Sequence, residues 1–210
     1  RIAVEVARKT VMFKTANGAI LLPGVLGFSA SDRADGPVIN LSYYVFPAFA
    51  RLSVVAPEVD WNGLIQTGLD QIRAARFDET KLPTDWISLR GDKPKPADGF
   101  PRQFSYNAIR IPLYMAWAGV GDWDHYSAFH AWALRSRGLA TVNVESGQDA
   151  DRLAERGYSA IGSLLACAVD RKPPGPDFRA VRDSDNYYSV TLQLLAMAAT
   201  NMRYNSCQER

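Results

Sequence analysis

Apolar residues recur at the spacing of a helix face along most of this chain. Between residues 61 and 76, Leu64, Ile65, Leu69 and Ile72 fall on one side of a helix, and Asp60 precedes it as a cap. Helices of this length must bury their apolar faces against one another, so the chain is predicted to be all-α with about seven helices. The other predicted helices cover residues 2–11, 43–52, 107–118, 124 or 127 to 135, 158–169 and 186–203.

Only short segments have an extended pattern. The turn signal Asn17-Gly18 with residues 19–24 predicts a short β-hairpin, and residues 85–89 and 141–144 are predicted as short strands. Residues 90–103 form a loop rich in Gly, Pro and Lys. No internal repeat is evident, so residues 1–210 are predicted to form a single domain.

The charge and hydropathy patterns exclude two classes of partner. The 210 residues carry a net charge of only +2, and the basic residues form no stripe, so nucleic acid is not expected as a partner. The longest apolar stretches are too short to span a bilayer, so no membrane is expected and the protein is predicted to be soluble.

The cysteines and histidines do not form a metal-binding pattern. Cys167 lies in an apolar helical segment and is predicted to be a buried free thiol, with a disulfide to Cys207 as the less favoured alternative. His125 and His130 are five residues apart, without a carboxylate pattern beside them. We interpret both as structural or surface residues and expect no zinc site.

The chain begins at Arg1, and helical periodicity starts at once, without an N-cap or a signal peptide. This favours a chain cut from a longer protein; a disordered preceding tail is the alternative.

Five motifs in order over nearly the whole chain resemble those of glycoside hydrolase family 8. The members of this family are endo-acting, inverting enzymes that cut β-1,4-glucan, and within it the chain resembles the endoglucanases associated with bacterial cellulose production. The motifs are Leu-Leu-Pro-Gly at residues 21–24, Asn-Leu-Ser-Tyr at 40–43, Asp-Trp at 85–86, Phe-Ser-Tyr-Asn-Ala-Ile-Arg at 104–110 and Tyr-Tyr at 187–188.

The resemblance implies an (α/α)6 toroid of twelve helices, of which this chain would supply roughly the C-terminal half. It implies a β-1,4-glucan ligand, no cofactor, and a periplasmic or secreted location. In the family the general acid is a glutamate in a Ser-Glu-Gly-Gln type segment, upstream of the matched region. Glu145 begins a similar string downstream, which we interpret as a coincidence. The missing N-terminal part of the same catalytic domain is therefore the expected partner.

The catalytic base is the main departure from the family pattern. Inverting glycosidases use two carboxyl groups about 6.5–9.5 Å apart, and one of them takes a proton from the attacking water. The family aspartate is replaced by Asn107, whose amide has no basic site for that proton. Three explanations stay open: a loop carboxylate such as Asp98 or Asp92 acts instead, the substitution was engineered to trap substrate, or activity was lost. Asp98 precedes Gly99, which is equally typical of a turn aspartate.

The predicted glucan-binding residues surround Asn107. Arg110 lies three residues further, on the same helix face, where it would hold a carboxylate or donate to sugar hydroxyls. Aromatic rings suit the apolar faces of glucose, and neighbouring tyrosines point about 100° apart, so one of each pair is expected in the core. The aromatic candidates are Tyr43, Trp86, Tyr106, and one of Tyr187 and Tyr188.

The predicted function is that of an endo-β-1,4-glucanase, and the isolated chain is expected to be weak or inactive because it lacks a matched general acid. A chitosanase is the alternative within the family, because loop acids such as Asp92 and Asp98 suit a cationic substrate. A non-catalytic helical module that binds glycan or a partner protein is the alternative outside enzymes.

Overall fold

The computed structural model describes residues 2–15, 18–136 and 138–207. Within these residues seven α-helices and three short 3-10 turns account for most of the regular structure, so the all-α prediction is confirmed. The helices are α1 (Ile2–Thr10), α2 (Phe46–Val55), α3 (Trp61–Ala74), α4 (Arg110–Ala118), α5 (Trp123–Ala133), α6 (Arg156–Asp170) and α7 (Tyr187–Arg203). The 3-10 turns are η1 (Leu41–Tyr43), η2 (Pro176–Arg179) and η3 (Asn205–Cys207).

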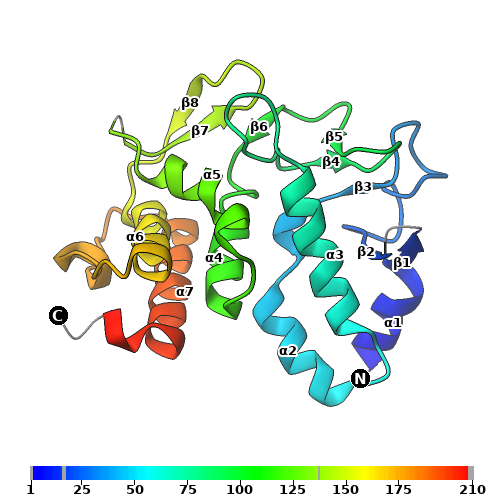
Figure 1. The fold of residues 1–210 in the computed structure, drawn as a ribbon, viewed down its shortest axis with the longest axis horizontal. Coiled ribbons are helices and arrows are strands. Elements are labelled where there is room, and N and C mark those ends of the chain that lie inside the picture. The colour runs from blue at the N-terminus through cyan, green and yellow to red at the C-terminus, as the bar shows by residue number, and fades with distance from the viewer. Residues whose placement is uncertain (1, 16–17, 137, 208–210) are drawn as a thin grey trace.

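Three small antiparallel sheets accompany the helices. The predicted hairpin pairs β1 (Met12–Thr15) with β2 (Gly18–Leu21), with Met12 opposite Leu21, while Asn17 of the turn lies outside the described residues. The second sheet has the order β3 (Val38–Ile39), β4 (Ile87–Ser88), β5 (Lys95–Pro96). The third has the order β6 (Gln103–Phe104), β7 (Ala140–Asn143), β8 (Asp149–Arg152). The last two sheets lie together across one end of the helices (Figure 1).

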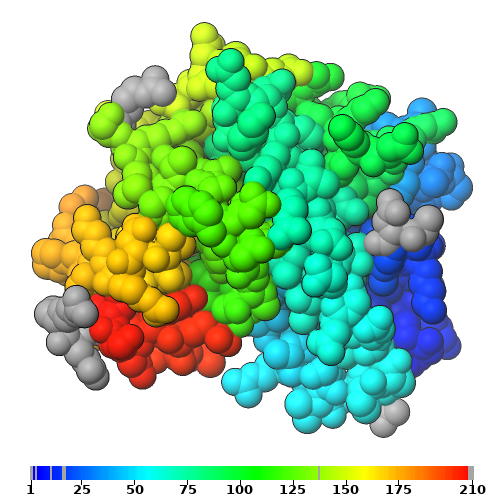
Figure 2. All heavy atoms as spheres, in the orientation of Figure 1, coloured from blue at the N-terminus to red at the C-terminus, as the bar shows by residue number. Residues whose placement is uncertain are grey.

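Helix α4 is the centre of the helical layer. It packs against α2 on one side and against α6 and α7 on the other (Figure 1). Residues 111–116 of α4 are all buried, as expected for a helix with neighbours on several sides. Side chains fill the spaces between the elements, and the N-terminal and C-terminal residues lie on opposite sides of the molecule (Figure 2). The start of α4, at Arg110, therefore lies between the two groups of helices.

Helix α5 begins earlier than the sequence indicated. Its cap is Asp122, whose carboxylate accepts the backbone N–H of His125, so the predicted start at Asp124 or Ser127 was wrong. The ring of His125 accepts in return from the backbone N–H of Asp122 at 3.2 Å. This reciprocal pair uses histidine where the usual capping box has Glu or Gln, which is why the pattern was missed.

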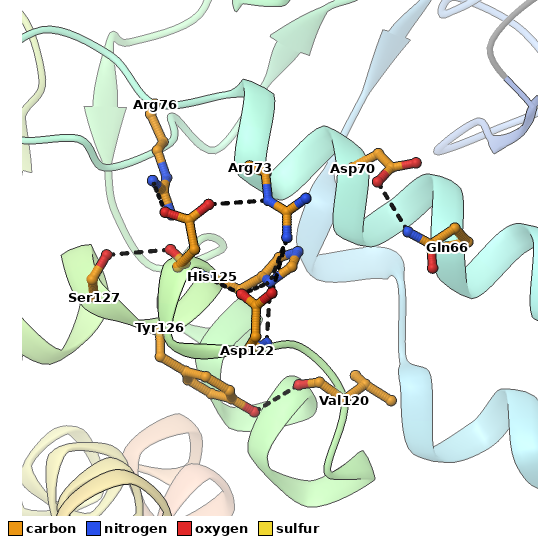
Figure 3. A network of polar contacts seen from close by, with 10 residues as sticks. Gln66, Asp70, Arg73, Arg76, Val120, Asp122, His125, Tyr126 and Ser127 are labelled. Atoms are coloured by element: carbon orange, nitrogen blue, oxygen red, sulfur yellow. Dashed lines mark hydrogen bonds and ion pairs between the residues drawn. The ribbon is translucent and has the colours of Figure 1, made fainter.

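The same aspartate joins α5 to α3. Arg73 of α3 donates to Asp122 at 3.1 Å and lies 3.0 Å from Asp124, which Arg76 also reaches at 2.9 Å (Figure 3). On the other side of α5, His130 lies 2.6 Å from Asp170 of α6. Both histidines thus have a carboxylate partner. That of His125 is Asp122, the cap of its own helix, and that of His130 is Asp170 of α6.

Helix α2 begins at Phe46 rather than near Tyr43, which belongs to η1. Asn40 starts η1, and its side chain accepts from the backbone N–H and the hydroxyl of Ser42 at 3.0 and 2.7 Å. Tyr44 follows with a fully buried ring, and its hydroxyl accepts the N–H of Leu21. The predicted helix start was therefore wrong by three residues, because the chain first makes a separate turn that places Ser42 and Tyr43.

Cys167 and Cys207 form a disulfide, with their Cα atoms 6.0 Å apart. The prediction of a free thiol at Cys167 was wrong. Helix α7 packs along α6, so η3, which follows α7, brings Cys207 next to Cys167 of α6. In the described residues no helix is both long and apolar enough to cross a membrane.

Candidate active site

A partly buried carboxylate organises the turn that precedes α4. One oxygen of Asp85 accepts the backbone N–H groups of Ser105 and Ala108 at 3.0 and 2.8 Å. The other oxygen accepts from the backbone N–H and the side-chain amide of Asn107 at 3.4 and 3.3 Å. Burial raises the pKa of Asp85, and these donors only partly offset the effect. Asp85 thus holds the turn that leads into α4 from a segment some twenty residues earlier, a role that the sequence did not reveal.

The Asn107 amide is held at both ends. Its oxygen accepts from Arg110 Nη2 at 2.6 Å, while its nitrogen faces Asp85. The same Arg110 nitrogen donates to Ser42 Oγ at 2.8 Å. Helix α4 begins at Arg110, so the helix start predicted at Asn107 was wrong by three residues and Asn107 lies in the preceding turn. The two side chains are in contact all the same, and Arg110 holds an amide and a hydroxyl rather than a carboxylate. The order Asn40–Ser42–Arg110–Asn107–Asp85 is a continuous chain of hydrogen bonds.

These groups open into a surface hollow of about 400 Å³. Tyr106 is 40% exposed at its rim, and the Arg110 guanidinium lies 5.9 Å from the centre of the Tyr43 ring. Flat apolar rings beside amide and guanidinium groups suit the faces and hydroxyls of a sugar. The residues that line the hollow are Tyr43, Tyr106, Asn107, Arg110 and Tyr188.

The two pairs of neighbouring tyrosines, 43–44 and 187–188, differ in how their rings are placed. Tyr44 is buried, as expected for the second member of its pair, while Tyr43 lines the hollow. Tyr188 also lines the hollow, but Tyr187 is 87% exposed and belongs neither to the core nor to the hollow lining. The Tyr188 hydroxyl donates to the backbone oxygen of Tyr106, and burial raises its pKa to about 12 despite the opposing effect of Arg110. It therefore stays a proton donor at neutral pH.

Trp86 is the centre of an aromatic cluster beside the hollow. Phe100 stacks on its indole at 4.7 Å between ring centres, Phe28 stacks on it at 5.5 Å, and Tyr43 meets it edge-on at 6.2 Å. The indole thus packs against protein rings, and it links the hollow to the loop that carries Phe100.

Of the two predicted loop acids, one lies next to this cluster. The backbone N–H of Ala97 donates to the Trp86 carbonyl at 3.1 Å, and Asp98 follows directly. The Asp98 carboxylate is exposed and makes no hydrogen bond or ion pair with the described residues. Asp92 lines a separate hollow of about 390 Å³ together with Asp70, Leu89 and Gly91. Neither acid belongs to the lining of the Asn107 hollow, but Asp98 is connected to it through Trp86.

Two acids that the sequence did not single out lie near Tyr106. Burial raises the pKa of Tyr106 most, and Asp151 and then Glu155 raise it further through their charges. Glu155 also accepts from the backbone and side chain of Asn186, the cap of α7, at 2.8 and 2.6 Å. They reach Tyr106 through the pairing of β6, β7 and β8, which no short-range pattern indicates. Among the described residues no three His, Cys, Asp or Glu side chains gather as metal ligands.

A hollow lined by tyrosines, an amide and a guanidinium has the chemistry of a sugar-binding site, and a layer of helices carries it here. The family model for glycosyl hydrolases family 8 matches residues 2–202. The chain therefore belongs to glycoside hydrolase family 8.

Relatives with curated names agree with this family. The chain is 30% identical to a probable endoglucanase of Novacetimonas hansenii over 86% of its length, and 36% identical to an endoglucanase of Cellulomonas uda over 72%. It spans 52% and 40% of the lengths of these two proteins, so it covers about half of its curated relatives.

Solved structures show the same fold. A family 8 endo-β-1,4-glucanase from an Achatina fulica gut metagenomic library has a TM-score of 0.82 at 28% identity, over 95% of this chain and 62% of that one. The endo-β-1,4-glucanase CMCax from Acetobacter xylinum has a TM-score of 0.80 at 25% identity, over 94% and 61%. The predicted toroid fold is thereby confirmed for the part of the toroid that this chain covers.

Proposed function

We propose that this chain carries the glucan-binding and base side of an inverting endo-β-1,4-glucanase active site. The observation that carries the proposal is the hollow in which Asn107 and Arg110 lie among Tyr43, Tyr106 and Tyr188, in a member of family 8. The names of the similar proteins, endoglucanases throughout, support the substrate class.

In this proposal a β-1,4-glucan lies across the hollow with its rings against the tyrosines. Arg110 donates to sugar hydroxyls, and the Asn107 oxygen orients the attacking water. Asp98 removes the proton from that water while the new oxygen–carbon bond forms and the glycosidic bond breaks on the opposite face. The free Asp98 carboxylate and its link through Trp86 favour it over Asp92, which lines another hollow.

The general acid is proposed to come from an N-terminal part of the same catalytic domain, outside these 210 residues. Two observations support this. The chain spans about half of its curated relatives, and no carboxylate lines the Asn107 hollow among the described residues. The disulfide between Cys167 and Cys207 favours an oxidising compartment, in line with export to the periplasm or the medium.

Two substrates separate the base from the acid. Dinitrophenyl β-cellobioside releases a leaving group that needs no proton, whereas carboxymethyl cellulose requires a general acid. We expect the isolated chain to hydrolyse the first and not the second, and Asp98→Asn to abolish the first reaction. Release of reducing ends from carboxymethyl cellulose by the isolated chain would contradict the account of the missing acid, and full activity of Asp98→Asn would exclude Asp98 as the base.

Binding tests the substrate class independently of turnover. We expect cellotetraose to bind the chain in isothermal titration calorimetry, and Arg110→Ala to weaken binding about tenfold or more, because a charged donor to hydroxyls is lost. Arg51→Ala, an exposed arginine on α2, is the matched control. Binding without any turnover of the activated substrate would instead favour a non-catalytic glycan-binding module.

A chitosanase is the second candidate, because Asp151 and Glu155 place negative charge near Tyr106. Chitotetraose and cellotetraose differ chiefly in the cationic amino groups of the former. Tighter binding of chitotetraose that falls with added salt, and falls again in Asp151→Asn, would favour the chitosanase.

A further inference from the structure

An ion pair in the loop between β2 and β3 is hydrogen-bonded to the segment that contains Asp98. Arg33 and Asp35 make a two-bond contact, with Nε donating to Oδ1 at 2.8 Å and Nη2 to Oδ2 at 3.2 Å. Both side chains are largely shielded from solvent, at 24% and 14% exposure. The Arg33 contact lowers the pKa of Asp35, so the carboxylate is charged in the neutral pH range.

Both members of this pair bond the backbone of one residue. Arg33 Nη2 donates to the Asp98 carbonyl at 2.6 Å, and the Asp98 N–H donates to Asp35 Oδ2 at 2.8 Å. The two partners are more than sixty residues away in sequence. A guanidinium–carboxylate pair thus holds the peptide groups on both sides of the Asp98 Cα, while the Asp98 carboxylate is free.

A second contact holds the loop from its other end. The Arg33 guanidinium lies 5.2 Å from the centre of the Phe100 ring, and Phe100 stacks on Trp86 beside the hollow. The pair itself is anchored to the sheet, because Ser88 of β4 donates to the Asp35 carbonyl at 2.5 Å and Arg90 donates to the Ala34 carbonyl. Residues 98 and 100 are therefore fixed by the same side chain, relative to the strand that follows Trp86.

We propose that Arg33 and Asp35 are positioning residues for Asp98. This pair, here called the clamp, would hold a loop-borne base in place, as a helix would hold a base on its own backbone. An aspartate in a Gly- and Pro-rich loop would otherwise sample many positions, and a displacement of about 1 Å in a reacting group can cost a hundredfold in rate. The clamp fixes the backbone through opposite charges that compensate each other, so it leaves the Asp98 carboxylate free to accept a proton. This inference rests on the proposed role of Asp98 as the base.

The test compares Asp35→Asn with Asp32→Asn, using dinitrophenyl β-cellobioside. Asp35→Asn keeps the shape of the side chain but loses the charge that pairs with Arg33. We expect kcat to fall about tenfold to a hundredfold with KM changed less than about twofold, since the substrate still meets the tyrosines and Arg110. Asp32 lies in the same loop but bonds Ser29 and Gly27 and not the Asp98 segment, so its variant should keep the wild-type kcat.

Further variants separate positioning from folding. Arg33→Lys keeps the charge but cannot make the two-bond contact, so an intermediate loss of kcat is expected. Asp35→Glu should restore part of the rate lost in Asp35→Asn. Amide hydrogen exchange at Asp98 should quicken in Asp35→Asn, while the cellotetraose affinity and melting temperature stay close to wild type. If the wild type is active and Asp98→Asn is inactive, an unchanged kcat in Asp35→Asn would overturn the positioning role of Arg33 and Asp35 while leaving Asp98 as the base. An inactive wild type, or an active Asp98→Asn, would overturn the proposed role of Asp98 and the clamp with it.

Discussion

At the scale of single residues, the pair formed by Asp85 and Asn107 determines the character of the hollow. The Asn107 amide nitrogen lies 3.3 Å from an oxygen of Asp85, which is partly buried. A carboxylate in place of the amide would bring two like charges together, with Arg110 as the nearest compensating group. Asparagine avoids that conflict. In the proposed mechanism its oxygen still orients the water, and another residue removes the proton.

We therefore expect Asn107→Asp to cost stability at neutral pH, by about 1–3 kcal/mol, because a donor to Asp85 is lost and a second charge is added. The loss should shrink as the pH falls through the carboxyl range, where one of the two acids takes up a proton. Urea unfolding of both proteins at pH 7 and pH 4 measures the difference. An equal loss at both values would contradict the electrostatic explanation.

The burial of Asp85 has its own pH signature. Its pKa is raised in the folded state, so the ionised carboxylate costs free energy in the fold, and this cost appears as the pH rises above the usual carboxyl range near 3.8. Asp85→Asn cannot ionise, so its stability relative to wild type should improve as the pH rises from below 3.8 to neutral. Denaturant titrations at both ends of that range provide the test. A relative stability that worsens with rising pH would mean that the Asp85 charge stabilises the fold.

Only part of this site was open to prediction from sequence. The contact of Asn107 with Arg110 follows from their spacing of three residues on a helix start. The roles of Asp85 and Ser42 depend on segments that return from elsewhere in the chain, and neither has a local pattern that reveals its partner. Asp85 belongs to the Asp-Trp motif that resembles the family pattern, but that motif does not indicate what the Asp85 side chain contacts.

At the scale of elements, apolar spacing predicted the helices well, while their starting residues depended on side-chain contacts. Helix α3 begins after Asp60 as predicted, with Leu64, Leu69 and Ile72 buried. Helices α2, α4 and α5 begin elsewhere. A separate 3-10 turn precedes α2, a turn held by Asp85 precedes α4, and Asp122 caps α5 with the help of His125.

The α5 cap gives a matched comparison of two neighbouring aspartates. Asp122→Ala removes the cap and a bond from Arg73, and should lower the free energy of unfolding by about 1–2 kcal/mol. Asp124→Ala removes only exposed ion pairs with Arg73 and Arg76, and should cost about 1 kcal/mol or less. Chemical denaturation of both variants measures these values. A larger loss for Asp124→Ala would place the start of α5 at Asp124 after all.

The disulfide is the other link between elements that sequence reasoning did not favour. It ties α6 to η3 across 40 residues of chain. Cys207→Ser should lower stability by about 2–4 kcal/mol, because the unfolded chain regains the freedom of that loop. Thermal melts of the variant, and of the wild type with and without reductant, test this, and a wild type indifferent to reductant would contradict it.

At the scale of the whole molecule, the family resemblance supplied the architecture that periodicity alone did not. Helical spacing predicted an all-α chain, but the central place of α4 and the sheets at one end of the helices depend on long-range packing. The proposed active site also belongs to this scale, because this chain would carry the base side of the inverting mechanism and residues outside it the general acid.

The stereochemistry of hydrolysis tests that division most directly. Proton NMR can follow dinitrophenyl β-cellobioside in the presence of the isolated chain and identify the first anomer of cellobiose that forms. A base-activated water that attacks opposite to the leaving group must give the α-anomer first, which then mutarotates. Formation of the α-anomer by the wild type, and its loss in Asp98→Asn, is the predicted result. The β-anomer as first product, or no hydrolysis above the background rate, would contradict the proposal that this chain carries the base side of an inverting site.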